Sequence, residues 1–193
     1  MPLRMSPAPA SALRSVLAAL GSAVTEEIPG DPRPDTPLPI HEISRIGQRS
    51  GPPSTQLTGW RFLLHDGGGG RPRTVVGAAE AVRTPSGWSF ARLHSGPYVS
   101  STAHALEQAT ALPLPYQPRL LSIPELYMLT LWLHGDADAE PETGVPAASD
   151  LLVPLAPAPP GIAAHQTQRV DALLPRLTHR LTASPLLGDT AVV

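Results

Sequence analysis

The sequence predicts an α+β fold, in which an antiparallel or mixed sheet of about five to seven strands carries two or three helices on one face. Two apolar runs without charge, residues 126–133 and 151–155, are separated by turn-forming residues. Such runs are typical of paired central strands that are buried on both faces of a sheet. The 193 residues suffice for one domain with a sizeable core.

The N-terminal part is predicted to contain one helix and a proline-rich connection. Apolar residues recur at helical spacing from Ser11, a suitable N-cap, and predict a helix over 12–24. The prolines that follow predict an extended, exposed linker, and the pattern over 40–48 predicts a short edge strand. The predicted organisation is a disordered N-terminus at 1–9, one domain over 10–183 with the linker at 28–39, and a flexible tail at 184–193.

Three strands are then predicted as an antiparallel meander with short connections. In the first of them, 57–65, the side chains of Trp60, Phe62 and Leu64 share one face because side chains alternate along a strand. A run of four glycines follows Asp66 as a hairpin tip. The other two predicted strands are 74–82 and 88–94.

Two further helices are predicted. Pro97 suits the first position of a helix, which the apolar spacing extends to residue 112. Ile123-Pro124-Glu125 predicts a bend before the first apolar run. Residues 166–182 carry a one-sided apolar stripe interrupted by Pro175, which predicts a kinked helix.

The composition argues against several functional classes. The net charge is −2 and all 14 basic residues are scattered arginines, which leaves no electrostatic footprint for nucleic acid. The absence of lysine and asparagine indicates a GC-rich bacterial genome. The absence of cysteine excludes disulfides, thiolate catalysis and cysteine-ligated zinc.

The sequence also predicts no membrane association. No apolar run approaches the ~20 residues of a membrane helix. The stretch 16–24 is short and weakly apolar for a signal peptide. A cytoplasmic location is therefore expected, with secretion as the less favoured alternative.

Patterns that resemble metal sites lack the residues that such sites need. His104 and Glu107 share a predicted helix face but have no further ligand at a metal-binding spacing. The acidic residues of 136–142 lack the glycine and the final glutamate of a calcium loop, and they predict a solvated acidic loop instead. No metal and no cofactor are predicted.

Catalytic motifs are incomplete in the same way. Gly67 to Gly70 precede a strand, whereas a phosphate-binding loop precedes a helix. Ser95 lies beside His94 but outside a GxSxG pattern. No catalytic residue is assigned, and the chain is predicted to be more a binding protein than an enzyme.

Two sets of residues are the candidate binding residues. The first is an anion-binding strip of arginines in the meander, for which cross-strand pairing with Glu80 is the favoured alternative. Its members are Arg61, Arg73 and Arg92. The second set would wall an apolar pocket against the sheet, with membership of the core as the favoured alternative. Its members are Trp60, Trp88, His94, Tyr98 and His134.

Three functions remain open. The favoured one is a non-enzymatic accessory or protein-binding domain, whose sheet and proline-rich borders engage another protein. The second is a small-ligand-binding protein or enzyme with a pocket between sheet and helices near Trp88, His94 and His134. The third is a self-assembling structural subunit, which would be a homo-oligomer. A closed apolar cavity with convergent polar groups would favour the second over the first.

Overall fold

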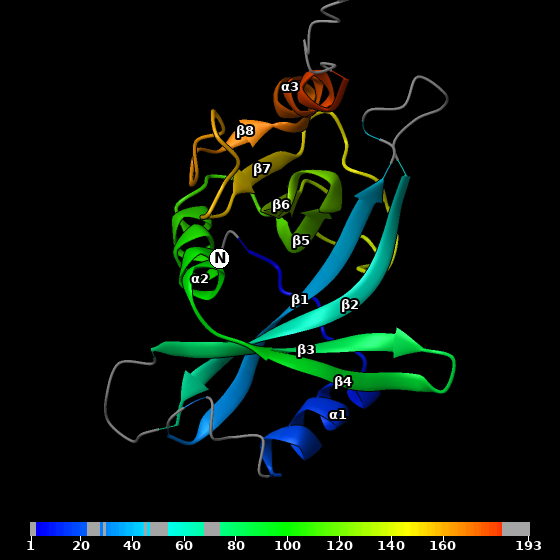
Figure 1. Cartoon of the computed structure of the whole chain (residues 1–193), viewed down its shortest axis with the longest axis vertical. Helices are drawn as coiled ribbons and strands as arrows, with labels where there is room; N and C mark the ends of the chain where they lie inside the picture. The colour runs from blue at the N-terminus through cyan, green and yellow to red at the C-terminus, as the bar shows by residue number, and fades with distance from the viewer. Residues whose placement is uncertain are drawn as a thin grey trace, which may run out of the picture.

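The computed structural model describes residues 3–22, 28, 30–44, 46, 54–67 and 74–182. These residues form one eight-stranded sheet and three α-helices (Figure 1). The strands are β1 Pro32–Ser44, β2 Ser54–Asp66, β3 Val75–Thr84, β4 Gly87–His94, β5 Gln117–Ile123, β6 Met128–His134, β7 Leu151–Pro154 and β8 Gln168–Arg169. The helices are α1 Ala10–Leu20, α2 Pro97–Thr110 and α3 Val170–Thr182, with a 3-10 turn, η2, at Pro124–Leu126.

The strand order is β4-β3-β2-β1-β5-β6-β7-β8. Neighbouring strands are antiparallel except for β1 and β5, which are parallel over Ile40–Glu42. The predicted α+β class is confirmed, with more strands than expected. None of the helices in the described ranges is both long and apolar enough to span a membrane.

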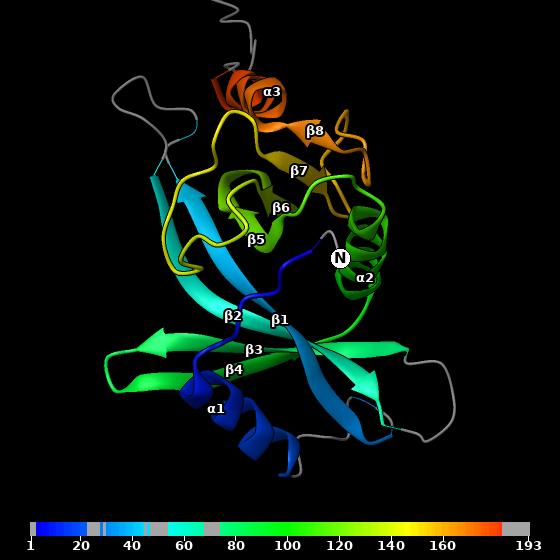
Figure 2. The same cartoon turned by 180° about the vertical axis from the view of Figure 1, so that it is seen from behind.

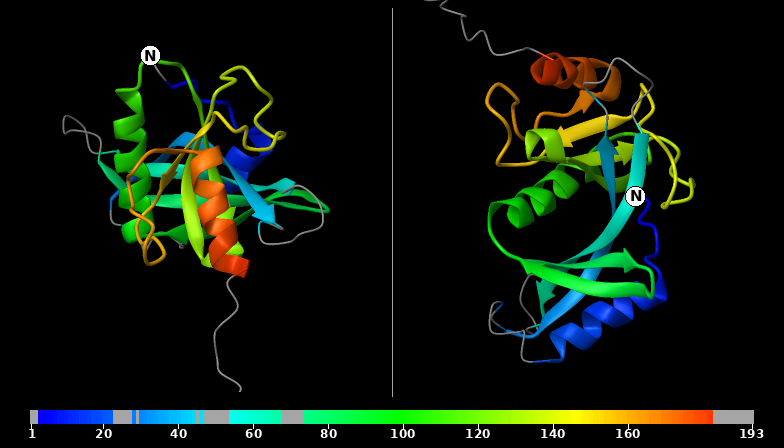
Figure 3. Two further views of the ribbon diagram at one scale, coloured as in Figure 1. Left: turned by 90° about the horizontal axis from the view of Figure 1, so that it is seen from above. Right: turned by 45° about the vertical axis from the view of Figure 1, so that its right-hand side comes forward.

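Helices cover both faces of the sheet. On β2, Trp60 and Phe62 pack with α1, whereas Leu63 belongs to the cluster under α2. On β6, Trp132 packs with α3, whereas Leu131 faces α2. Side chains alternate along each strand, so α2 lies on the face opposite α1 and α3. Figure 3 shows α1 and α3 at opposite ends of the molecule.

The meander and the paired apolar strands were predicted and are present. Strands β2, β3 and β4 pair in sequence, and Trp60, Phe62 and Leu64 share the face towards α1. Strands β6 and β7 pair antiparallel, with Leu131 opposite Val153 in the buried core. The predicted bend before β6 is η2. Helix α3 covers residues 170–182 of the predicted helix at 166–182, and Pro175 lies inside it.

The linker prediction was wrong for residues 32–39, which belong to strand β1 and pair with β2. The prolines of β1 are Pro32, Pro34, Pro37 and Pro39, and a register shift lies between Asp35 and Pro37. Proline cannot donate to a ladder and is tolerated at an edge. The β5 pairing begins only at Ile40, so this part of β1 has a ladder on the β2 side alone.

Residues 3–9, expected to be disordered, form an extended strap across the sheet. Leu3 makes a parallel bridge with Tyr116, and the Arg4 N–H donates to the Tyr116 carbonyl at 2.8 Å. The strap then crosses β1 and β2 to reach α1 (Figure 2). Ser6 within it is buried. The predicted tail at 184–193, the two N-terminal residues and Gly68 to Gly70 lie outside the described residues.

Tyr127 combines backbone strain with full exposure. It ends η2 in the left-handed conformation with φ 48°, and its side chain is 91% exposed. A non-glycine residue in this region costs about 1–2 kcal/mol. Nothing in its packing offsets this cost, although Tyr98 donates a hydrogen bond to its carbonyl at 3.1 Å.

Replacement of Tyr127 by glycine is expected to raise the free energy of unfolding by about 1 kcal/mol, because glycine occupies positive φ without strain. Urea denaturation measures the effect. Tyr127→Ala is the matched control, since it removes the ring but keeps the Cβ atom. Equal stability of the two variants would contradict the strain at this position.

Candidate functional site

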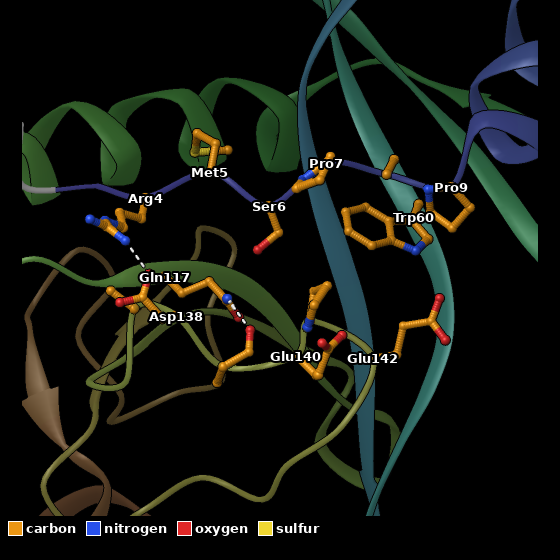
Figure 4. Close-up of a pocket in the computed structure, with 14 residues that line it drawn as sticks. Arg4, Met5, Ser6, Pro7, Pro9, Trp60, Gln117, Asp138, Glu140 and Glu142 are labelled. Carbon is orange, nitrogen blue, oxygen red and sulfur yellow. Dashed lines mark hydrogen bonds and ion pairs between the residues drawn. The ribbon is translucent and has the colours of Figure 1, made fainter.

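A cavity of about 530 Å³ lies between the strap and the loop 135–149, which connects β6 to β7 (Figure 4). We call it the strap–loop cavity. One wall is the strap from Arg4 to Pro9, and the opposite wall is the loop from Ala137 to Glu142. Trp60 and Gln117 complete the lining.

Trp60 supplies an unpartnered donor at this cavity. The residue is fully buried, and its indole N–H has no hydrogen-bond partner among the residues that the structure describes. Leaving a buried donor unpaired costs about 1–3 kcal/mol. Figure 4 shows the Trp60 ring between the strap and the side of the loop that carries Glu142. An acceptor that reached this N–H would relieve that cost.

The loop wall is acidic. Asp138, Glu140 and Glu142 all line the cavity and are exposed. Arg4 of the strap pairs with Asp138, whereas Glu140 and Glu142 form no ion pair within the described ranges. The cavity thus carries an excess of negative charge, which favours a cationic ligand.

The loop was predicted to be solvated, but buried side chains beneath it hold its backbone. Arg119 donates to the carbonyls of Glu140, at 3.0 Å, and of Thr143. Gln117 Nε2 donates to the Ala139 carbonyl at 2.6 Å, and His41 Nε2 donates to the Pro141 carbonyl at 2.9 Å. The carboxylates therefore project from a fixed main chain.

Burial shifts the pKa values of two of these anchors. It lowers the pKa of His41 to about 4, and the hydrogen bond to Pro141 only partly opposes this. The imidazole is therefore neutral at neutral pH. Burial also lowers the pKa of Arg119 to about 10, so the guanidinium remains charged. It stacks over the Trp132 ring at 4.8 Å, a cation–π contact.

Asp150 closes the other end of the loop. Its carboxylate accepts hydrogen bonds from the Trp132 indole at 2.7 Å, His134 Nδ1 at 2.8 Å, the Gly135 N–H at 2.9 Å and the Ala147 N–H at 3.0 Å. Burial alone would raise the pKa of Asp150, but these donors, led by His134, lower it. His134 is therefore engaged in fixing the loop.

Replacement of Asp150 by asparagine is expected to destabilise the protein by about 2–3 kcal/mol. The amide nitrogen of asparagine is a donor, and it would face N–H groups that now donate to the carboxylate. Chemical denaturation measures the loss, and hydrogen exchange of the Gly135 and Ala147 amides should accelerate. Asp136→Asn is the control, since an amide oxygen preserves its bond to the Asp138 N–H. Unchanged exchange at both amides would refute the anchoring role.

A second cavity, of about 330 Å³, brings together several of the predicted residues on the opposite face of β2. Arg61, His94 and Tyr98 line it with the exposed Tyr127. Adjacent residues of a strand face opposite ways, so Trp60 and Arg61 serve different cavities. Of the predicted arginine strip, Arg61 and Arg92 form ion pairs with Glu80.

Glu80 is the centre of that pairing. Arg61 Nη2 donates to it at 3.2 Å, His94 Nε2 lies at 2.6 Å, and Arg92 is 3.9 Å away. Burial would raise the pKa of Glu80, but His94 and Arg61 outweigh it and lower the pKa to about 2. Its stabilising effect is therefore present above pH 4.5 and is lost as the pH falls towards 2.

Glu80→Gln is expected to lower the free energy of unfolding by about 3 kcal/mol at neutral pH. This follows from the fall of the Glu80 pKa from 4.5 to about 2, at about 1.36 kcal/mol per pH unit. The variant should also lose the fall in stability that Glu80 causes below pH 4.5. Denaturation at a series of pH values from 7 to 2.5 measures both, with the exposed Glu125→Gln as control. A constant difference between wild type and Glu80→Gln across this range would contradict the assignment.

The remaining predicted residues do not converge on one pocket. Trp88 packs in the cluster beneath α1, and Arg73 lies outside the described residues. His104 makes an edge-to-face contact with His165, with 4.7 Å between ring centroids. In the described part of the chain, no three side chains of the metal-ligating types gather as a metal site.

The sequence interpretation missed the strap, His41, Gln117 and Arg119. Their partners are carbonyls of a loop far along the chain, which no local pattern encodes. The available signal was polarity: Gln117 and Arg119 alternate at the start of a strand that continues with the apolar Leu120 and Leu121.

No family model, no curated protein and no solved structure matches the chain. The function is therefore argued from the cavities themselves.

Proposed function

We propose that the protein is a binding domain whose strap–loop cavity accepts an extended, basic segment of a partner protein. The observation that carries the proposal is the unpartnered, fully buried indole N–H of Trp60 at a cavity with an acidic wall. The Trp60 N–H lacks an acceptor among the described residues, and the exposed carboxylates of Glu140 and Glu142 attract a cationic group.

A polypeptide supplies both groups in one ligand. Each peptide unit carries a carbonyl that can accept from the indole, and an arginine or lysine side chain can reach the carboxylates. Met5, Pro7 and Pro9 of the strap line the cavity and offer apolar contact to the stem of such a side chain. A simple metal cation would leave the Trp60 donor unsatisfied.

The two walls are ordered before the ligand arrives. Buried His41, Gln117 and Arg119 hold the loop, and the strap is fixed at Tyr116 and at the start of α1. Proline at positions 7 and 9 further restricts the strap. Binding therefore costs little conformational entropy in the protein, which favours recognition of a flexible partner segment.

The test titrates the full chain with the peptide Ala-Arg-Pro-Arg-Ala and with its citrulline counterpart, which is neutral but isosteric. The readout is the indole N–H resonance of Trp60 in a ¹⁵N-labelled sample, assigned with Trp60→Phe. The resonance should move as the indole donates to a peptide carbonyl. The resonance of Trp132, whose donor is bonded to Asp150, should stay in place.

The double variant Glu140→Gln and Glu142→Gln should bind the arginine peptide at least tenfold more weakly, a loss of about 1.4 kcal/mol. The charge-matched control is Glu42→Gln with Glu125→Gln, both at exposed positions elsewhere. Equal binding of the two peptides, or an unmoved Trp60 resonance, would sink the proposal.

A further inference from the structure

A third cavity, of about 300 Å³, lies between α2 and the sheet. We call it the α2 pocket. Most of its lining is apolar, with polar groups at His65, Thr36, Glu107 and Thr110. The apolar lining residues are Leu3, Met5, Leu63, Val75, Ala103 and Leu106.

His65 is the unusual residue of this pocket. Both ring nitrogens are buried, and neither has a hydrogen-bond partner within the described part of the chain. A neutral imidazole carries one donor and one acceptor, so two polar groups are left unsatisfied. Alternation along β2 places Leu63 and His65 on the side of the strand that faces α2. The register between β2 and β3 shifts between Leu64 and His65.

Thr36 adds an independent observation on the same pocket. It adopts φ 45°, in the left-handed region, at the register shift of β1. Positive φ in a β-branched residue is a genuine outlier, and such strain concentrates at ligand sites. Its N–H donates to the Asp35 carboxylate at 2.8 Å, which holds the turn in place.

We propose that the α2 pocket binds a small uncharged molecule with an apolar body and one hydroxyl group, of the phenol or alcohol class, held by His65. A hydroxyl can bond to whichever His65 nitrogen faces it, donating to a bare nitrogen or accepting from a protonated one. A half-turn of the ring exchanges its nitrogens with its carbons, so a nitrogen can meet the ligand without movement of the backbone.

Charge and size support this class of ligand. The carboxylate of Glu107 at the pocket disfavours an anion. The volume of about 300 Å³ is at the lower end for ligand pockets, which suits a single-ring molecule. The site is distinct from the strap–loop cavity and its ligand chemistry is different.

The test measures binding of phenol, toluene and benzoate to the full chain by ligand-observed NMR. Phenol should bind saturably at millimolar concentration, toluene at least tenfold more weakly, and benzoate not at all. His65→Phe should remove the preference, so that phenol and toluene bind alike. Comparable toluene and phenol affinity in the wild type, tighter benzoate binding, or no saturation by phenol would each overturn the proposal.

A second variant keeps the test decisive if His65→Phe fails to fold. Ala103→Leu places three more carbon atoms into the pocket and should abolish phenol binding. Its control is Gln108→Leu, which adds a leucine at an exposed position of the same helix and should bind phenol as the wild type does. Phenol binding that survives Ala103→Leu would overturn the assignment to this pocket. The Trp60 resonance reports the peptide site separately, so the two proposals fail independently.

Discussion

The architecture depends on β1, the strand that joins the two halves of the sheet. It pairs along its length with β2 of the meander and over Ile40–Glu42 with β5 of the second half. This parallel contact is the one ladder between the halves among the described strands. Because β1 is shared, Leu38 and Ile40 join the core beneath α2, while Ile43 joins the core beneath α3. Loss of β1 would remove the strand that contributes side chains to both of these cores.

Buried polar groups hold the loop 135–149 against the sheet. Arg119 and Asp150 are almost fully enclosed, yet each is satisfied, largely by the main chain of the loop 135–149. Buried charges of this kind are tolerated only when they are paired and hydrogen-bonded. Trp60 and His65 depart from this pattern, since their buried ring nitrogens have no hydrogen-bond partner among the described residues. The two proposed binding sites are built on these unsatisfied groups.

The elements with clear local patterns could be predicted from the sequence. Alternation in β2, the turn before β4, and Pro97 at the start of α2 each specify their structure within a few residues. Strand β1 could not be predicted in this way, because the prolines oppose a strand locally and the decision belongs to β2, its distant partner. Tertiary pairing outweighed local propensity there.

The candidate sites were less predictable than the fold, for the same reason. Trp60 lines the strap–loop cavity, whereas Arg61, His94 and Tyr98 line the cavity on the opposite face, because Trp60 and Arg61 are adjacent on β2 and face opposite ways. His41 and Arg119 gained their roles only through carbonyls about a hundred and about twenty residues away, at Pro141 and Glu140. Such contacts depend on the completed topology.

Met5 borders both the strap–loop cavity and the α2 pocket, so one segment of the strap is a common wall of the two. Ligands that bind to two cavities with a common wall are thermodynamically linked whenever either ligand displaces that wall. Linkage is reciprocal: the factor by which the first occupant changes the affinity for the second equals the factor in the reverse direction. A ligand of either cavity that displaced Met5 would therefore change the affinity of the other cavity for its own ligand.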